Sequence, residues 1–393
     1  MTEVVITNAL RTPIAKFLGP FSSLKAVDLG VKIVRAILEE SKIDPADIDE
    51  VLMGQGRQLG SGPNPGRQVS IGAGIPNSVP AMTLNKACGS SLKAISQARN
   101  SILCGDARII IAGGMESMST IPFLLPGMRQ GYRLGHRQAV DGNYEDGFNC
   151  PLVGGPMGLT AEFLADRYQI SRLEQDEYAL QSFHKWQAAE DAGKLYDERI
   201  AVEVQGKKGK VELVEADSHA RRDLKLENLA KLKPVFRPEN GTVHAGNSSG
   251  ITDGASAVLV MAREEAEKRD LEILATVGPA KVAGVDPRYM GIGPVPAIQK
   301  LCAQLEKTVD DFDLIELNEA FAAQVIACDR ELHLPMDRVN VNGGAIAIGH
   351  PIGATGARIV ATLLHEMKRR NSKLGMASLC MSGGMGMAVS FTR

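Results

Sequence analysis

The chain carries the same order of predicted elements near both of its ends, and this repeat restricts the folds open to it. Residues 25–52 read as an amphipathic helix, an acidic turn and a strand, and residues 295–318 read the same way. The acidic turns at 47–49 and 311–313 align at an offset of 264 residues. The repeat predicts two similar α/β halves in which helices and strands alternate.

A second marker has nearly the same offset. The apolar strand before Gly113-Gly114 matches the one before Gly383-Gly384 at an offset of 270 residues. Acid-rich turns and glycine pairs are each common, so we rely on the agreement between the two offsets. The fold class we predict is α/β, with mixed sheets in the two halves.

The segment between the halves has a different composition. Residues 119–248 are rich in Gly, Pro and charged residues, with an amphipathic helix near 159–192 and a basic stretch over 221–233. We interpret this segment as an insertion that extends over the first half. Residues 249–262 then return to a buried-helix pattern followed by a strand. We predict an N-terminal half at 1–118 completed by 249–272, an inserted loop domain at 119–248, and a C-terminal half at 273–393.

Charge and cysteine usage exclude several classes of function. Lys+Arg total 44 and Asp+Glu 46, and a net charge of −2 gives no global field for nucleic acid or an anionic membrane. The six cysteines form no C-x-x-C pair, which argues against a metal site. Their wide spacing, with no secretory leader and no run of 18 apolar residues, predicts a cytoplasmic protein that does not enter a membrane.

Two segments could supply a nucleophile and a base. Cys88 precedes a helical pattern, and a helix start lowers a thiol pKa and favours the thiolate. The alternative is a buried structural cysteine. His350 lies among five glycines of the segment 343–356 and before Pro351, which favours a constrained functional loop over an ordinary structural histidine. Phosphate binding is a rival function for this loop, but it lacks the Gly-Lys-Ser/Thr of a P-loop.

Two further residues follow apolar strands. Cys380 ends the strand before Gly383, and Asn318 with Glu319 follows the strand 314–317. Open α/β sheets place their chemistry at such strand ends, although Asn318 could instead be a helix cap. Two cysteines, a histidine and an amide without metal-like spacing suit acyl transfer better than metal binding.

These segments resemble the thiolase family over the whole chain. The likeness covers RTPIAKF at 11–17, the C-G-S turn at Cys88, GGMESMS at 113–119, MGLTAE at 157–162, AGNSSGITDGA at 245–255, MGIGPVPA at 290–297, NEAFA at 318–322, GGAIAIGHPIGATGAR at 343–358 and the C-x-x-G-G-M-G ending. The resemblance implies two mixed sheets, one per half, in a layered αβαβα arrangement with a shared helical layer. It also implies that the loop domain binds coenzyme A (CoA), and that the protein is a homodimer or homotetramer.

The resemblance also assigns roles to residues. It makes Cys88 the acylated nucleophile, His350 its activator and Cys380 the general acid/base. Asn318 with His350 would form one oxyanion site, and the backbone amides of Cys88 and Ser382 a second. The implied CoA contacts are Met157, Arg221, Phe236, Ala245, Ser249, Ala320 and Phe321. CoA thioesters are the implied substrates, and no other cofactor or metal is expected.

The activity this implies is acetyl or acyl transfer between CoA thioesters. Three residues depart from the usual family pattern: Ser382 and Ser91 stand where many members have Gly, and Pro156 stands where biosynthetic members have His. A degradative 3-ketoacyl-CoA thiolase of broader chain length therefore remains an alternative. A non-catalytic acyl-CoA- or lipid-binding relative and a decarboxylating ketosynthase fit less well, because each would be expected to lack one of the four catalytic residues.

Overall fold

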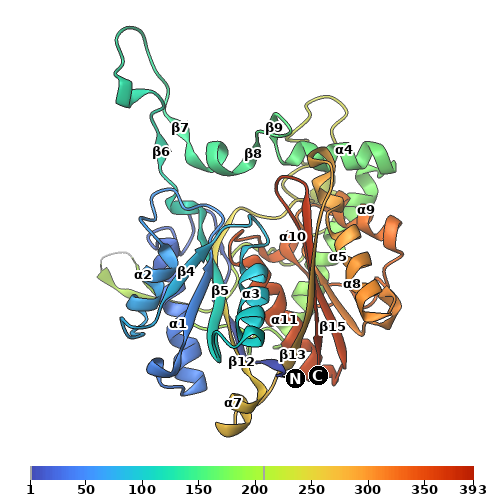
Figure 1. Ribbon diagram of the computed structural model, residues 1–393. Coiled ribbons are helices and arrows are strands. Elements are labelled where there is room, and N and C mark those ends of the chain that lie inside the picture. The colour runs from blue at the N-terminus through green and yellow to red at the C-terminus, as the bar shows by residue number, and fades with distance from the viewer. Residues whose placement is uncertain (1, 207–208) are drawn as a thin grey trace.

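Two half-sheets, whose strand orders match except for one additional edge strand in the first, form the centre of the molecule (Figure 1). The structure is a computed structural model that describes residues 2–206 and 209–393, so residues 1, 207 and 208 of the predicted domains lie outside the described residues. The first half has the order β1-β12-β5-β3-β4, with β1 (Val4–Arg11), β3 (Glu50–Gly54), β4 (Ala81–Leu84), β5 (Ile109–Ser117) and β12 (Thr252–Ala262). The second half has the order β13-β16-β15-β14, with β13 (Ala275–Gly284), β14 (Leu314–Leu317), β15 (Leu374–Met381) and β16 (Met385–Thr392).

The half-sheets join along one edge. β1 pairs with β13 at Val5↔Thr276 and Ile6↔Ala275, and β2 (Ala15–Lys16) pairs with β12, so one sheet of ten strands results. The two sheets expected from the sequence are thus halves of one sheet, because each half would otherwise leave a strand edge unpaired at the seam. Each half is mixed, since β3 is parallel to β4 and β5, and β14 to β15, whereas the other pairs are antiparallel.

Helices make three layers around these half-sheets (Figure 1). α1 (Ala26–Ser41) and α2 (Pro65–Gly72) cover the outer face of the first half, and α8 (Pro294–Leu305) and α9 (Ala322–Leu332) cover that of the second. α3 (Ser90–Cys104) and α11 (Thr355–Arg370) pack together between them. The predicted αβαβα layering is confirmed.

Strand β5 illustrates why the sheet is buried on both faces. Ile109 and Ile111 belong to the core under α1, whereas Ile110 and Ala112 belong to the core under α3 and α11. Side chains alternate along a strand, so a continuous apolar run fills two cores at once.

The predicted repeat is present in the structure. α1, the 3₁₀ turn η1 (Pro45–Asp47) and β3 recur as α8, η7 (Val309–Asp311) and β14. The predicted match between the glycine pairs 113–114 and 383–384 was wrong, however. Gly113 lies within β5, whereas Gly383 and Gly384 form the turn between β15 and β16. The strands correspond, but their glycine pairs do not.

The segment 119–248 differs from its prediction in two respects. The expected helix near 159–192 is two helices, α4 (Gly158–Tyr168) and α5 (Arg172–Asp191), separated at Gln169, which has a φ of 51°. These helices pack on α9 and α10 (Ala345–Ile348) of the second half, not on the first. From this segment, β10 (Val202–Gln205), which pairs with β11 (Val211–Val214), contributes to the core of the first half.

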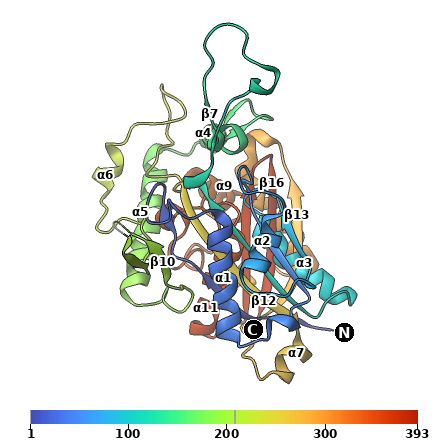
Figure 2. The same ribbon diagram turned by 90° about the vertical axis from the view of Figure 1, so that its left-hand side faces the viewer.

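The segment 249–262 also differs, because it has no helix and forms the strand β12. The smaller elements of the chain are β6 (Phe123–Leu124), β7 (Val140–Asp141), β8 (Asn149–Cys150), β9 (Gly155–Pro156), α6 (Leu226–Ala230), α7 (Arg263–Lys268), η2 (Met118–Thr120), η3 (Met128–Gln130), η4 (Tyr144–Phe148) and η6 (Pro287–Ile292). β6 and β7 form an arm that projects from the body in both views (Figure 2). In the described part of the chain, no helix has the length and apolarity needed to span a bilayer.

Candidate active site

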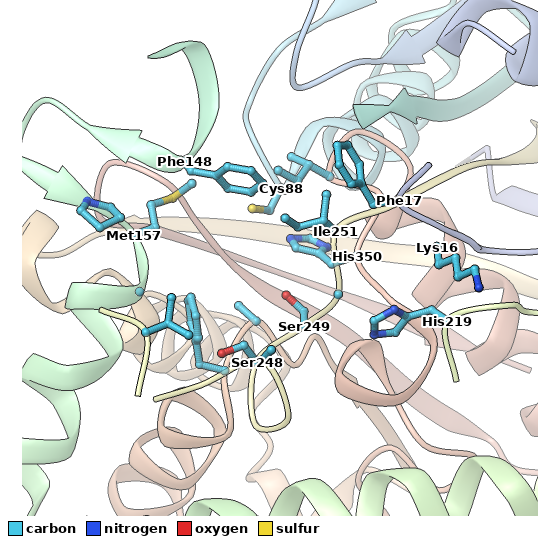
Figure 3. Close-up of a pocket in the computed structure, with 18 of the residues that line it drawn as sticks. Lys16, Phe17, Cys88, Phe148, Met157, His219, Ser248, Ser249, Ile251 and His350 are labelled. Carbon is cyan, nitrogen blue, oxygen red and sulfur yellow. The ribbon is translucent and has the colours of Figure 1, made fainter. Parts of the chain in front are cut away.

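A cavity of about 660 Å³ lies at the N-terminal ends of the two central helices (Figure 3). Cys88 comes two residues before α3 and His350 five residues before α11, and both line this cavity. All seven residues expected to contact CoA line it as well: Met157, Arg221, Phe236, Ala245, Ser249, Ala320 and Phe321. The fold thus brings nine of the twelve predicted site residues to one cavity, although they come from all three predicted parts of the chain.

The three remaining residues lie beside the cavity. Cys380 packs with Ala320 and Phe321, and Asn318 precedes the same segment. The backbone N–H of Ser382 lies against the sulfur of Cys88. The carboxyl ends of the parallel strands β14 and β15 deliver Asn318 and Cys380 to this edge, which is where open α/β sheets place functional groups.

Cys88 sits on a strained turn before α3. Ala87 has a φ of 47°, a conformation that costs energy for a residue with a side chain. Ser90 holds the turn, because its Oγ accepts from Lys86 N at 2.9 Å and donates to Ala87 O at 2.6 Å. Cys88 and the ring of His350 line the same cavity, where Figure 3 shows them next to each other.

The expectation that the helix start favours the Cys88 thiolate was wrong for the free protein. Burial raises the pKa of Cys88 to about 11, although the N–H groups of Ser382 and Cys88 itself and the charge of Arg57 act in the opposite direction. Desolvation of a buried charge exceeds the stabilisation that these donors provide. The thiol is therefore protonated at neutral pH, and a base is needed to take its proton.

His350 is in the right state to act as that base. Burial lowers its pKa to about 3, assisted by the positive charges of Arg358 and Arg57, so the imidazole is neutral. Nδ1 lies 2.6 Å from Oγ1 of Thr355, whereas Nε2 is buried with no hydrogen-bond partner among the described residues. The preceding Gly349 has a φ of 108° and packs against Thr252, where a Cβ atom would lie 2.3 Å from a methyl carbon.

Asn318 is not a helix cap. α9 begins at Ala322 with Phe321 as its cap, and the Asn318 amide is 1% exposed. Within the described residues, neither its Oδ1 nor its Nδ2 has a hydrogen-bond partner. A buried amide without partners is costly, so this group is suited to hold a water molecule or a ligand oxygen.

Two buried carboxylates hold the loop that carries His350. Before His350, Glu319 Oε2 accepts from Ser182 Oγ at 2.7 Å and from Ile346 N at 3.1 Å. After His350, Glu116 Oε2 accepts from Gly353 N at 2.9 Å. Glu319 was named from the sequence only because it follows the strand at 314–317. No sequence pattern pointed to Glu116, which reaches this loop from β5.

Cys380 is fully buried, and burial raises the pKa of its thiol well above the ordinary value. Ser382 stands at a position where many members of the family have Gly, so a side chain there could restrict the φ angle of the loop. The left-handed conformations of this turn occur instead at Gly383 and Gly384, with φ of 85° and 82°. Ser382 thus causes no backbone strain of that kind.

Arg57 is a residue of the site that the sequence did not reveal. It is 1% exposed, its Nη1 donates to Asn143 Oδ1 at 2.9 Å, and its guanidinium carbon lies 4.0 Å from the centroid of the Phe148 ring. The Phe148 ring lies beside Cys88 in the cavity (Figure 3). Other lining residues missed from the sequence are Lys16, Phe17, Tyr144, His219, Ile251 and Ile352.

Comparison with known proteins agrees with this fold. Residues 4–264 match the family described as thiolase, N-terminal domain, and residues 271–393 match thiolase, C-terminal domain. The chain belongs to the thiolase family. It is 48% identical over 393 residues to an acetyl-CoA acetyltransferase of Cupriavidus necator, covering 100% of both chains.

Solved structures give the same result. The crystal structure of the Bacillus anthracis acetyl-CoA acetyltransferase matches with a TM-score of 0.97 at 40% identity, covering 100% of this chain and 99% of that chain. The human mitochondrial 3-ketoacyl-CoA thiolase in complex with CoA matches with a TM-score of 0.94 at 40% identity, covering 100% and 98%.

Proposed function

We propose that the protein transfers an acetyl group between CoA thioesters through an acyl-Cys88 intermediate, making acetoacetyl-CoA and CoA from two acetyl-CoA molecules or running in reverse. One observation carries this proposal: a protonated thiol and a neutral imidazole line the same cavity of about 660 Å³, and the imidazole Nε2 has no hydrogen-bond partner among the described residues. The names of the relatives support it, since several are acetyl-CoA acetyltransferases at 45–48% identity.

In the acylation step, His350 Nε2 takes the proton of Cys88 as the sulfur attacks the thioester carbonyl carbon. The backbone N–H groups of Ser382 and Cys88, which already lie against the sulfur, are placed to donate to the developing oxyanion. CoA leaves as its sulfur takes the proton of Cys380. The products are acyl-Cys88, free CoA, an imidazolium at His350 and a thiolate at Cys380.

In the condensation step, the Cys380 thiolate removes an α-proton from the second acetyl-CoA. The enolate oxygen is stabilised by Nε2–H of His350 and by a water molecule bound at the Asn318 amide. The enolate carbon attacks the acyl group, and the departing Cys88 sulfur takes its proton back from His350. All three groups return to their starting protonation states.

Seven residues are proposed to hold CoA along the cavity: Met157, Arg221, Phe236, Ala245, Ser249, Ala320 and Phe321. The side chains that line the cavity are mostly apolar. The rings of Phe236 and Phe321 pack edge to face with their centroids 6.3 Å apart, and such a lining suits the pantetheine arm of CoA. Pro156 also lines the cavity and cannot donate the hydrogen bonds of a histidine. A degradative preference for longer 3-ketoacyl-CoA substrates is therefore the second candidate.

We further propose a cytoplasmic homodimer or homotetramer that acts in fatty acid metabolism and needs no cofactor or metal besides its CoA substrates. All six cysteines are free, which fits a reducing compartment. Across the described ranges, no three His, Cys, Asp or Glu side chains gather as they would around a metal ion. We also propose that the chain divides into three parts. These are an N-terminal half at 1–118 completed by 249–272, a loop domain at 119–248, and a C-terminal half at 273–393.

The decisive experiment is intact mass spectrometry after incubation with acetyl-CoA. The wild-type protein should gain one acetyl group, and Cys88→Ala should gain none. Cys104→Ala is the matched control, because Cys104 is exposed at the far end of α3 and should not alter acetylation. Acetylation of Cys88→Ala during turnover would overturn the assignment of the nucleophile.

A second assay separates the two candidate substrates. Thiolysis of acetoacetyl-CoA is compared with thiolysis of one longer 3-ketoacyl-CoA. A higher kcat/KM for the longer substrate would favour the degradative alternative. Absence of thiolysis with both, despite CoA binding, would favour a binding protein.

A further inference from the structure

The imidazole of His350 is oriented by a buried threonine. Thr355, the first residue of α11, is fully buried and places its Oγ1 at 2.6 Å from His350 Nδ1. The same Oγ1 lies 3.0 Å from the backbone oxygen of Pro351. The hydroxyl thus bridges the ring and the loop that carries the ring.

The geometry indicates the direction of these hydrogen bonds. The Pro351 oxygen can only accept, whereas Nδ1 of His350 can donate, so Oγ1 makes both hydrogen bonds only when its single proton is directed to Pro351 O. A lone pair of Oγ1 is then available to accept a hydrogen bond from Nδ1–H of His350. A histidine that is neutral and carries its proton on Nδ1 has a lone pair on Nε2, the nitrogen that is buried without a partner in the described residues.

We propose that Thr355 is a positioning residue that holds His350 in the Nδ1–H tautomer and so keeps Nε2 free to accept the proton of Cys88. This inference rests on the proposed acyl transfer, in which His350 is the base. With the opposite tautomer, Nε2 would already carry a proton and would have no lone pair with which to accept the proton of Cys88.

The surroundings of the ring make this hydrogen bond important. Arg358 and Arg57 are the charged groups whose positive charge acts on His350, and both oppose protonation of the ring. Neither bonds to an imidazole nitrogen, so charge alone does not choose between the tautomers. Thr355 also keeps its bond after Nε2 is protonated, because the imidazolium donates from Nδ1 as well.

Thr355 is itself rigidly held. A β-branched side chain at a helix start has few rotamers, and the bond to Pro351 O selects one of them. The loop on its N-terminal side is fixed by Gly353 N, which donates to Glu116. The hydroxyl is therefore in place before any substrate enters.

Three variants test the proposal. Thr355→Val keeps the shape of the side chain but removes the hydroxyl, and Thr355→Ser keeps the hydroxyl. Thr362→Val is the matched control, because Thr362 is a buried threonine on the same helix whose hydroxyl bonds to Glu198 at 3.2 Å. Unfolding temperatures of all three show whether each variant folds.

The direct measurement is the ¹⁵N NMR spectrum of protein labelled in histidine, with His350→Gln used to assign the His350 signals. We expect wild type, Thr355→Ser and Thr362→Val to show the Nδ1–H tautomer at neutral pH. Thr355→Val should show Nε2–H or a mixture of the two. A pure Nδ1–H signal in folded Thr355→Val would overturn the inference.

The functional measurement is the rate at which iodoacetamide modifies Cys88, followed by peptide mass spectrometry so that the exposed Cys104 is counted separately. Thr355→Val should lower this rate about 10-fold or more, because the variant loses part of the rate enhancement that a correctly positioned general base provides. Thr355→Ser should restore most of it. An unchanged rate in Thr355→Val would also overturn the inference, whereas failure of the proposed function would appear as acetylation of Cys88→Ala.

Discussion

Asp49 and Asp313 make the same pair of hydrogen bonds in the two halves of the protein. Asp49 Oδ2 accepts from the backbone N–H of Arg108 at 2.7 Å and of Ile109 at 2.9 Å. Asp313 Oδ2 accepts from Lys373 at 2.7 Å and from Leu374 at 3.0 Å. Each carboxylate ties the turn before one parallel strand to the start of its neighbour, so the duplication extends to single hydrogen bonds.

Cys380→Ser should affect the two half-reactions unequally. A CoA thiolate can leave with little help, whereas removal of an α-proton needs a base that serine does not supply near neutral pH. We expect α-proton exchange to fall by about 10²–10⁴-fold and acetylation of Cys88 to fall far less. Mass spectrometry follows the first half-reaction, and deuterium exchange into acetyl-CoA follows the second. Equal losses in both would argue against Cys380 as the α-proton base.

Arg57→Gln should shift the reactivity of Cys88 to higher pH. The charge of Arg57 lowers the pKa of Cys88 against the larger effect of burial, so its removal raises that pKa further. We expect alkylation of Cys88 at a fixed mildly alkaline pH to slow by about 3- to 10-fold, given an effective dielectric constant near 20. Arg57→Lys keeps the charge and should slow it less. A pH profile of Arg57→Gln that overlays the wild-type profile would contradict the prediction.

Arg221→Ala should weaken CoA binding without slowing the chemistry. Arg221 lines the cavity and is exposed, so its charge acts through a screened interaction with the phosphates of CoA. We expect KM for acetyl-CoA to rise by about two- to fivefold and to depend less on salt, with kcat nearly constant.

The control for Arg221 is its neighbour Arg222, which pairs with Asp191 at 2.5 Å and does not line the cavity. Arg222→Ala should leave KM unchanged. Equal effects of the two substitutions would mean that general surface charge, and not a specific contact, attracts CoA.

Gly344→Ala should destabilise the loop of His350. A Cβ atom there would lie 2.4 Å from the carboxyl carbon of Glu319, which is itself held by Tyr178, Ser182, Asn340 and Ile346. We expect a loss of about 1–3 kcal/mol in the free energy of unfolding, together with lower activity. Gly284→Ala is the control, since its new Cβ would meet its nearest atom at 3.8 Å. Equal stability of the two variants in urea would contradict the predicted clash.

The sequence was sufficient for the layers but not for every element. The repeat at 25–52 and 295–318 predicted the two halves because each segment has both a helical and a strand pattern. β12 was expected to begin with a helix, since a strand buried on both faces has no alternation to separate it from a buried helix. The single helix expected near 159–192 failed at Gln169, where one left-handed residue without a Gly or Pro signal divides α4 from α5.

The residues of the site were also only partly predictable from the sequence. Cys88 and His350 could be proposed because glycines and helix starts mark their segments. The pKa of Cys88 could not, since burial depends on how distant segments pack and outweighs the local helix effect. Arg57, Glu116 and Thr355 were missed because their partners are remote in sequence or because nothing distinguishes an ordinary residue that bonds to an active one.

The central position of β1 has a consequence for synthesis of the chain in the cell. β1 ends at Arg11, but its neighbours in the sheet end at Ala262 and Gly284. At about 5–20 residues per second, a ribosome needs on the order of 10–50 s to reach them. Throughout that time the apolar run at 4–6 has no strand to pair with, and unpaired apolar strands attract other chains. The first strand to emerge is therefore paired only after two thirds of the protein has been made, and a nascent chain of this kind has to be shielded until then.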